Sequence, residues 1–133
     1  MPSQIKKLIC SFGYAFKGIG NAATTQLNFR VHLVAALVAI SLGIGLHISS
    51  NEWMWIMLCI TLVLVAEMFN TAIEFLTDLV SPGYHPKAGH VKDIAAGAVL
   101  LCAIFALIMG IIIFEPKIAI LMHHAAQNQG HSF

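Results

Sequence analysis

The chain has 133 residues, of which 59% are hydrophobic and only 10% are charged, and its mean hydropathy of +0.84 excludes an ordinary soluble domain. Its formal net charge of +1, without a run of basic residues, argues against a nucleic-acid partner. The composition therefore predicts a membrane protein, and the length leaves room for little beyond the membrane-embedded part.

Residues 3–19 form the first predicted element, a short amphipathic helix. Six apolar side chains share about 100° of helical arc: Ile5, Leu8, Ile9, Phe12, Phe16 and Ile19. The lysines of this stretch point away from that arc. We expect the helix to lie in the cytoplasmic membrane interface with its lysines at anionic headgroups, although a helix that merely packs on the protein is an alternative.

Three apolar segments follow, each reaching the roughly 20 residues that a helix needs to cross the hydrocarbon core. They are residues 29–48, 53–75 and 94–114. Lysines precede the first segment and lie between the second and third, whereas the first link has none. By the positive-inside rule the N-terminus and the second loop are cytoplasmic, with Lys117 as a lone exception. The predicted fold is all-α, with one interfacial helix and three transmembrane helices.

The second apolar segment carries five polar residues that share one helical face: Glu67, Asn70, Thr71, Glu74 and Asp78. Counted from residue 53, Glu67 lies about 21 Å along the helix and Glu74 about 31 Å, against a core about 30 Å thick. Glu67 is thus expected just inside the cytoplasmic boundary and Glu74 at it. Ionisable groups at this depth usually mark a functional site. In the structural alternative, Asn70 and Thr71 bridge helices while Glu74 and Asp78 protrude into water.

Pro82 and Gly83 end this helix and open a loop predicted at residues 81–93. Its histidines, His85 and His90, are weak support for a zinc site because further ligands at suitable spacing are lacking. Small residues at 95–98 then open the third span with a surface that another helix can approach closely.

The chain is interpreted as one membrane-embedded domain, residues 1–116, followed by a polar tail, residues 117–133. The end of the tail, from His123, is polar enough for us to expect disorder.

Several of these stretches together resemble the signature of the bacterial diacylglycerol kinase and undecaprenol kinase family. They are AEMFNTAIEFLTD at 66–78, GYH in the loop, KDIAAGAVL at 92–100, FGYAFKGI at 12–19 and NFRVH at 28–32. The resemblance covers roughly residues 6–116. It implies a small integral membrane lipid kinase with a surface helix and three transmembrane helices, working as a homotrimer. No Walker or soluble-kinase signature stands in the sequence.

The resemblance also implies roles for the matching positions. Glu67 resembles the carboxylate that accepts the proton of the lipid hydroxyl, with Asn70 beside it, and Glu74 resembles the ligand of the magnesium carried with ATP. Lys7 and Arg30 fall near the lipid-contacting region. Positions that surround the nucleotide are Tyr14, Gly83, Tyr84, His85, Lys92 and Asp93.

One position departs from the family's pattern, because Gln26 stands where a second metal-binding glutamate is common. A glutamine oxygen can still ligate magnesium, a hard cation, but one negative charge is lost. The expected cofactor is Mg²⁺ with ATP as co-substrate, held by Glu74 and Gln26.

The predicted function is phosphorylation of undecaprenol or diacylglycerol in the bacterial inner membrane. ATP cannot enter the bilayer and the lipid cannot leave it, so their reacting groups meet only at the cytoplasmic interface, where the polar face lies. Phosphoryl transfer depends on alignment and charge neutralisation, to which Lys92 contributes, and Asp93 can hold that lysine or the nucleotide. The NFRVH segment and the HP of the loop look more like the undecaprenol kinases of the family.

A symmetric oligomer is expected, because three helices cannot enclose two substrates; the trimer itself comes from the resemblance. The competing interpretation is a non-enzymatic membrane carrier or channel subunit that binds a cation at Glu67 and Glu74. A carrier, however, has no need of Tyr84, His85, Lys92 and Asp93 on the cytoplasmic side.

Overall fold

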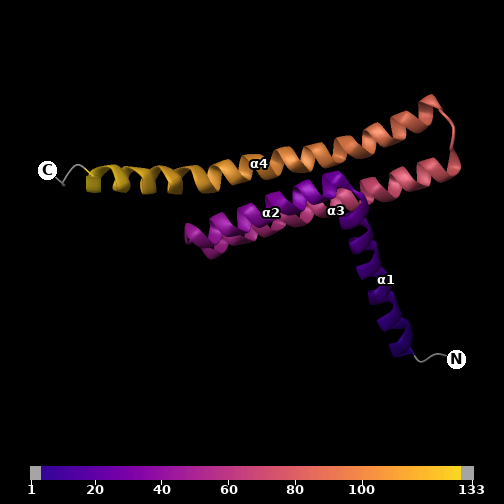
Figure 1. Cartoon of the computed structure of the whole chain (residues 1–133), viewed down its shortest axis with the longest axis horizontal. Helices are drawn as coiled ribbons and strands as arrows, with labels where there is room; N and C mark the ends of the chain where they lie inside the picture. The colour runs from indigo at the N-terminus through magenta and orange to yellow at the C-terminus, as the bar shows by residue number, and fades with distance from the viewer. Residues whose placement is uncertain (1–3, 130–133) are drawn as a thin grey trace.

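The computed structural model describes residues 4–129, which fold into four α-helices without a β-strand (Figure 1). The helices are α1 Gln4–Thr25, α2 Leu27–Gly45, α3 Ser50–Val80 and α4 Pro86–Gln129. Of these, α2, α3 and α4 are long and apolar enough to cross a membrane. The predicted all-α membrane fold with three spanning helices is therefore confirmed.

The three spanning helices run side by side, with α3 packed against both α2 and α4 (Figure 1). Helix α1 leaves this bundle steeply at the start of α2. At 19 residues, α2 is about 28 Å long, which matches a hydrocarbon core of about 30 Å. Helix α1 departs from the bundle at the end where α2 begins, next to Leu27 (Figure 1).

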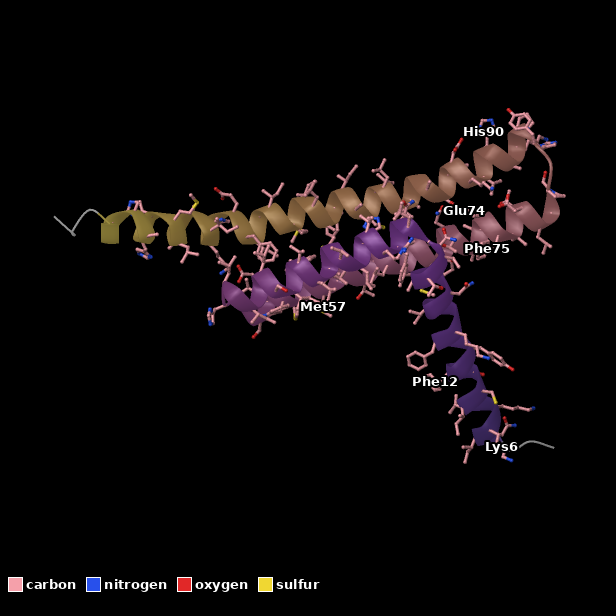
Figure 2. All side chains as sticks on the ribbon, viewed as in Figure 1. Lys6, Phe12, Met57, Glu74, Phe75 and His90 are labelled. Carbon is pink, nitrogen blue, oxygen red and sulfur yellow. The ribbon has the colours of Figure 1, made fainter. Side chains whose placement is uncertain are left out.

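Helix α1 keeps the amphipathic pattern predicted for residues 3–19 and extends it to Thr25. Its apolar side chains are exposed, and Phe12 points toward the side on which α2 and α3 run, whereas Lys6 lies near the far end of the helix (Figure 2). That arrangement suits a helix lying in the membrane interface with its apolar side toward hydrocarbon. The glycines of its last two turns do not interrupt it, and the Thr24 and Thr25 hydroxyls donate hydrogen bonds to carbonyls one turn earlier.

The link between α2 and α3 is closed by a capping box at the start of α3. The Ser49 backbone N–H donates to Glu52 Oε2 over 2.7 Å, and the Glu52 N–H donates back to Ser49 Oγ over 3.4 Å. Lys117 Nζ of α4 lies 3.2 Å from the same Glu52 oxygen. The lysine that departs from the charge bias is thus paired with an acid at this end of the bundle.

The loop predicted at residues 81–93 is shorter in the structure, because α4 already begins at Pro86. Proline is favourable in the first turn of a helix, where its missing N–H costs no hydrogen bond. His85 precedes it, and the Lys87 backbone N–H donates to His85 Nδ1 over 3.2 Å. Lys92 and Asp93 consequently lie on α4 and not in a loop.

The expected disorder of the tail from residue 123 is wrong up to Gln129, because α4 continues through Pro116 to that residue. Extending an existing helix costs no nucleation, and residues 117–122 are largely apolar. With 44 residues, α4 is about 66 Å long and runs past the α2–α3 link (Figure 1). Residues 130–133 of the predicted tail lie outside the described residues.

Candidate active site

A small cavity lies between the start of α2, the second half of α3 and the facing part of α4. Its volume is about 220 Å³. Its polar lining comes from Asn28 and His32 of α2 and from Glu67 and Asn70 of α3. The α4 side of the cavity is apolar and consists of Ala96, Val99, Leu100 and Ala103. Two residues of the predicted polar face of α3, Glu67 and Asn70, therefore line one cavity together.

Glu67 is the acidic residue at the centre of this lining, with only 3% of its surface exposed. His32 Nε2 lies 3.4 Å from Glu67 Oε1, so the buried carboxylate has an imidazole partner across the α2–α3 interface. Burying an unpaired charge is costly, and such groups are normally paired or functional. The structural alternative, in which Glu74 and Asp78 protrude into water, leaves this buried acid unexplained.

Asn70 follows Glu67 by one turn and is also buried, at 6% exposure. Its Nδ2 donates a hydrogen bond to Glu74 Oε1 over 3.0 Å, and Glu74 is half-buried between α3 and α4 (Figure 2). Its Oδ1 is buried and has no hydrogen-bond partner in the part of the chain that the structure describes. Most buried polar atoms are satisfied, so an orphaned acceptor beside a cavity suits a ligand that donates a hydrogen bond.

Asn28, in the first turn of α2, lines the same cavity as Glu67 and Asn70. The buried acid and amide therefore lie at the level of the first turns of α2.

A separate ion pair joins α3 to α4 next to the turn. Lys92 Nζ bonds to Asp78 Oδ1, and both side chains are partly exposed. The sequence suggested that Asp93 holds either Lys92 or the nucleotide; in the structure the carboxylate that holds Lys92 is Asp78. The short turn explains the difference, since antiparallel α3 and α4 bring these two positions together.

The remaining nucleotide candidates fall into two places. Gly83 and Tyr84 lie in the α3–α4 turn, and Tyr84 is 97% exposed. Tyr14 lies on α1, where Lys17 Nζ is 6.0 Å from its ring centroid. The first turns of α1 and the α3–α4 turn lie apart in one chain (Figure 1). A single chain therefore does not bring all of the predicted nucleotide residues together.

The lipid-region candidates are both exposed. Lys7 lies in the part of α1 that leads away from the bundle, and Arg30 lies in the first turn of α2. The structure thus places neither against the cavity lining, which on α2 is formed by Asn28, Val31 and His32.

The chemistry of the donor side chains decides whether Glu74 and Gln26 suit the magnesium that the resemblance implies. Residues 4–129 contain no group of three acidic, histidine or cysteine side chains that could hold a metal ion by themselves. Magnesium, however, needs only one or two carboxylates when phosphates and waters complete its shell. Glu74 fits this role, since one carboxylate oxygen is fixed by Asn70. Gln26 is half-buried at the α1–α2 junction, and its amide Nε2 lies 3.4 Å from Thr25 Oγ1.

His32 is the site residue that sequence reasoning missed. It lies inside the first predicted span, and an ionisable residue within a span is itself a signal of function. The segment NFRVH was read only as a whole, so its histidine received no role.

The fold and this cavity together define a class: a small helical membrane protein with a buried carboxylate beside a cavity between its spanning helices. Residues 13–114 match the family model described as prokaryotic diacylglycerol kinase. The chain belongs to that family, and it is therefore a membrane lipid kinase. The resemblance drawn from the sequence motifs is confirmed, and family membership decides against the carrier or channel interpretation.

Some similar proteins are named undecaprenol kinase and others diacylglycerol kinase. The undecaprenol kinase of Bacillus subtilis is 39% identical over 116 residues, covering 87% of this chain and 94% of that protein. The diacylglycerol kinase of Synechocystis is 40% identical over 116 residues, covering 86% of this chain and 66% of that protein. The diacylglycerol kinase of Escherichia coli K12 is 31% identical over 102 residues, covering 77% and 84%.

Proposed function

We propose that this kinase transfers the γ-phosphoryl group of ATP, with Mg²⁺, to the hydroxyl of undecaprenol or diacylglycerol at the cytoplasmic face of the bacterial inner membrane. The observation that carries the proposal is the buried Glu67 beside an orphaned Asn70 oxygen, at the level where α2 begins. A lipid alcohol anchored in the bilayer presents its hydroxyl at this level, and ATP reaches it from the water.

Glu67 acts as the general base. As the lipid oxygen forms its bond to the γ-phosphorus and the bond to ADP breaks, the Glu67 carboxylate takes the hydroxyl proton. Asn70 Oδ1 accepts a hydrogen bond from the same hydroxyl and orients it beforehand. Because the transition state of phosphoryl transfer is loose, a kinase accelerates the reaction mainly by positioning the hydroxyl and accepting its proton.

Glu74 and Gln26 are the residues that would hold the metal. Bound with ATP, Mg²⁺ neutralises charge on the phosphate oxygens. Asn70 fixes one Glu74 oxygen and so orients this carboxylate toward the nucleotide. Lys92 serves the phosphates as well, and for that it exchanges Asp78 for a phosphate oxygen.

The working unit is proposed to be a homotrimer, as the sequence resemblance implies. Within one chain, α1, which carries Tyr14, leads away from the bundle, whereas the α3–α4 turn, which carries Tyr84, lies at an end of the bundle (Figure 1). A second copy can bring its α1 or its turn to the same nucleotide, so that each site is completed by residues of two chains. The exposed small residues Ala96 and Ala98 of α4 offer a surface for that approach.

The proposed orientation has the N-terminus and the α3–α4 turn in the cytoplasm, and the lysines of α1 and α4 support it. Between the two candidate lipids, the NFRVH and HP segments favour undecaprenol. Similar proteins are named for each of the two lipids, so a direct comparison is needed.

The test is transfer of labelled γ-phosphate from ATP by the purified protein in phospholipid vesicles that contain undecaprenol or diacylglycerol. We expect magnesium-dependent labelling of the lipid fraction, with the larger kcat/KM for undecaprenol. Loss of labelling on chelation with EDTA, and its return with added magnesium, checks the metal. If neither undecaprenol nor diacylglycerol becomes labelled, the proposal is contradicted.

A further inference from the structure

We infer that His32 is a positioning residue for Glu67: its Nε2–H holds Oε1 of the carboxylate and leaves the other oxygen facing the lipid hydroxyl. The inference rests on the proposed role of Glu67 as the base. It starts from the 3.4 Å contact between His32 Nε2 and Glu67 Oε1, which joins α2 to α3. The distance is long for a hydrogen bond, but catalytic hydrogen bonds often tighten only when substrate binds.

A buried glutamate base needs a partner that fixes its orientation. The Glu67 side chain has three rotatable bonds, and the α4 wall of the cavity offers it only apolar atoms. Asn70 is the other polar side chain of α3 in the lining, and its Nδ2 already donates a hydrogen bond to Glu74. A donor from α2 is therefore what can hold the carboxylate. Asn28 and His32 both line the cavity on α2, and His32 is the one whose Nε2 lies 3.4 Å from Glu67 Oε1.

Among the charged and titratable groups around the cavity, the His32 imidazole is the one that can fix the Glu67 carboxylate. The residues that line the cavity include no lysine or arginine, and α4 contributes no titratable group to it. Arg30, two residues earlier on α2, is exposed. Glu74 lies two turns from Glu67 on α3, and it repels rather than fixes that carboxylate. An imidazole can donate from Nε2 in both its neutral and its protonated form.

His32 also borders a second space. An apolar groove of about 850 Å³ runs along α2, α3 and α4, and Val31, His32 and Ala103 line both this groove and the small cavity. A residue at this junction could instead contact the lipid itself. Contact with the lipid would change the KM for lipid, whereas positioning of the base changes kcat, so kinetics separates the two roles.

The experiment compares His32→Gln with His32→Asn. The two amides have the same chemistry, but only the longer one can bring an N–H to the place of the imidazole Nε2. We expect His32→Asn to lower kcat about 10- to 100-fold, as loss of an orienting partner does, while the KM values for lipid and ATP stay within about twofold. His32→Gln should recover most of the lost kcat.

A double-mutant cycle completes the test. In a Glu67→Gln background, His32→Asn should cause no further loss, because its effect passes through the carboxylate. Equal kcat for both amide variants, full additivity with Glu67→Gln, or a change confined to the KM for lipid would overturn the inference. If Glu67→Gln alone retains normal kcat, the proposed base is wrong, and that failure is visible without any His32 variant.

Discussion

Asn70 donates a hydrogen bond from Nδ2 to Glu74 Oε1 over 3.0 Å, while its Oδ1 stays buried without a hydrogen-bond partner in the described part of the chain. Because one amide group is flat, fixing its nitrogen on Glu74 also fixes the direction of its oxygen. The same side chain thus links the acid assigned to the metal with the cavity that Glu67 lines.

Asn70→Leu should separate activity from stability. The change removes the link to Glu74 and the acceptor for the lipid hydroxyl, so we expect kcat to fall at least about tenfold. It also removes a buried unsatisfied oxygen, so the unfolding temperature in detergent should not fall. Thr71→Val is the matched control, since Thr71 is equally buried but does not line the cavity, and it should keep its activity. A parallel loss of activity in both variants would argue that burial alone matters on this face.

Glu67→Gln should lower kcat about 10²- to 10⁴-fold, because it removes the proton acceptor and keeps the shape. Binding of a non-hydrolysable ATP analogue should remain nearly intact, since the base faces the lipid and not the nucleotide. Glu52→Gln provides the control at the opposite end of α3, where the acid serves a helix cap and an ion pair. That variant should retain kcat and lose some thermal stability. Near-normal turnover of Glu67→Gln would remove this residue from the mechanism.

The site was predictable where it depends on the period of one helix. Glu67, Asn70 and Thr71 repeat at helical spacing within an apolar span, and the structure buries all three together. What the sequence could not supply was pairing between helices. The contacts of His32 with Glu67 and of Lys92 with Asp78 depend on helix register and on a turn shorter than the predicted loop.

Helix ends were predicted less well than helix centres, for a physical reason. Hydropathy locates the part of a helix inside the hydrocarbon, but a helix continues into water until a residue stops it. Thus α3 runs on to Val80, before Pro82 and Gly83, and α4 runs from Pro86 to Gln129. Lys92 and Asp93 are therefore fixed on a helix, which a reading by hydropathy alone does not show.

Substitution of the two partners of the α3–α4 ion pair should change the affinity for ATP in opposite directions. Lys92→Ala should weaken ATP binding, because a phosphate ligand is lost. Asp78→Asn should strengthen it up to a few-fold, because Lys92 no longer exchanges a protein carboxylate for phosphate and exposed pairs of this kind are weak. Isothermal titration with a non-hydrolysable ATP analogue measures both. Weaker binding in Asp78→Asn would mean that the aspartate itself serves the nucleotide or holds the lysine in its productive place.

Because Gln26 is proposed to ligate magnesium, a change at this position should alter how much magnesium the enzyme needs. Gln26 stands at the α1–α2 junction with its amide nitrogen near Thr25 Oγ1, and Glu74 is the charged residue assigned to the metal. A second carboxylate would bind a hard cation more tightly than an amide oxygen does. Gln26→Glu should therefore lower the magnesium concentration for half-maximal activity and leave the KM for lipid unchanged.

The measurement for Gln26 is a magnesium titration at saturating ATP and lipid, run with wild type, Gln26→Glu and Gln26→Ala. If the glutamine oxygen ligates the metal, the magnesium concentration for half-maximal activity of wild type should lie between those of the two variants. Alanine removes that ligand, and glutamate adds a charge to it. Glu74→Ala should shift the midpoint further than Gln26→Ala, since it removes the only negative charge that the proposed site contributes to the metal. Identical midpoints for all three residues at position 26 would mean that this position does not face the metal and that Glu74, the phosphates and water complete the shell.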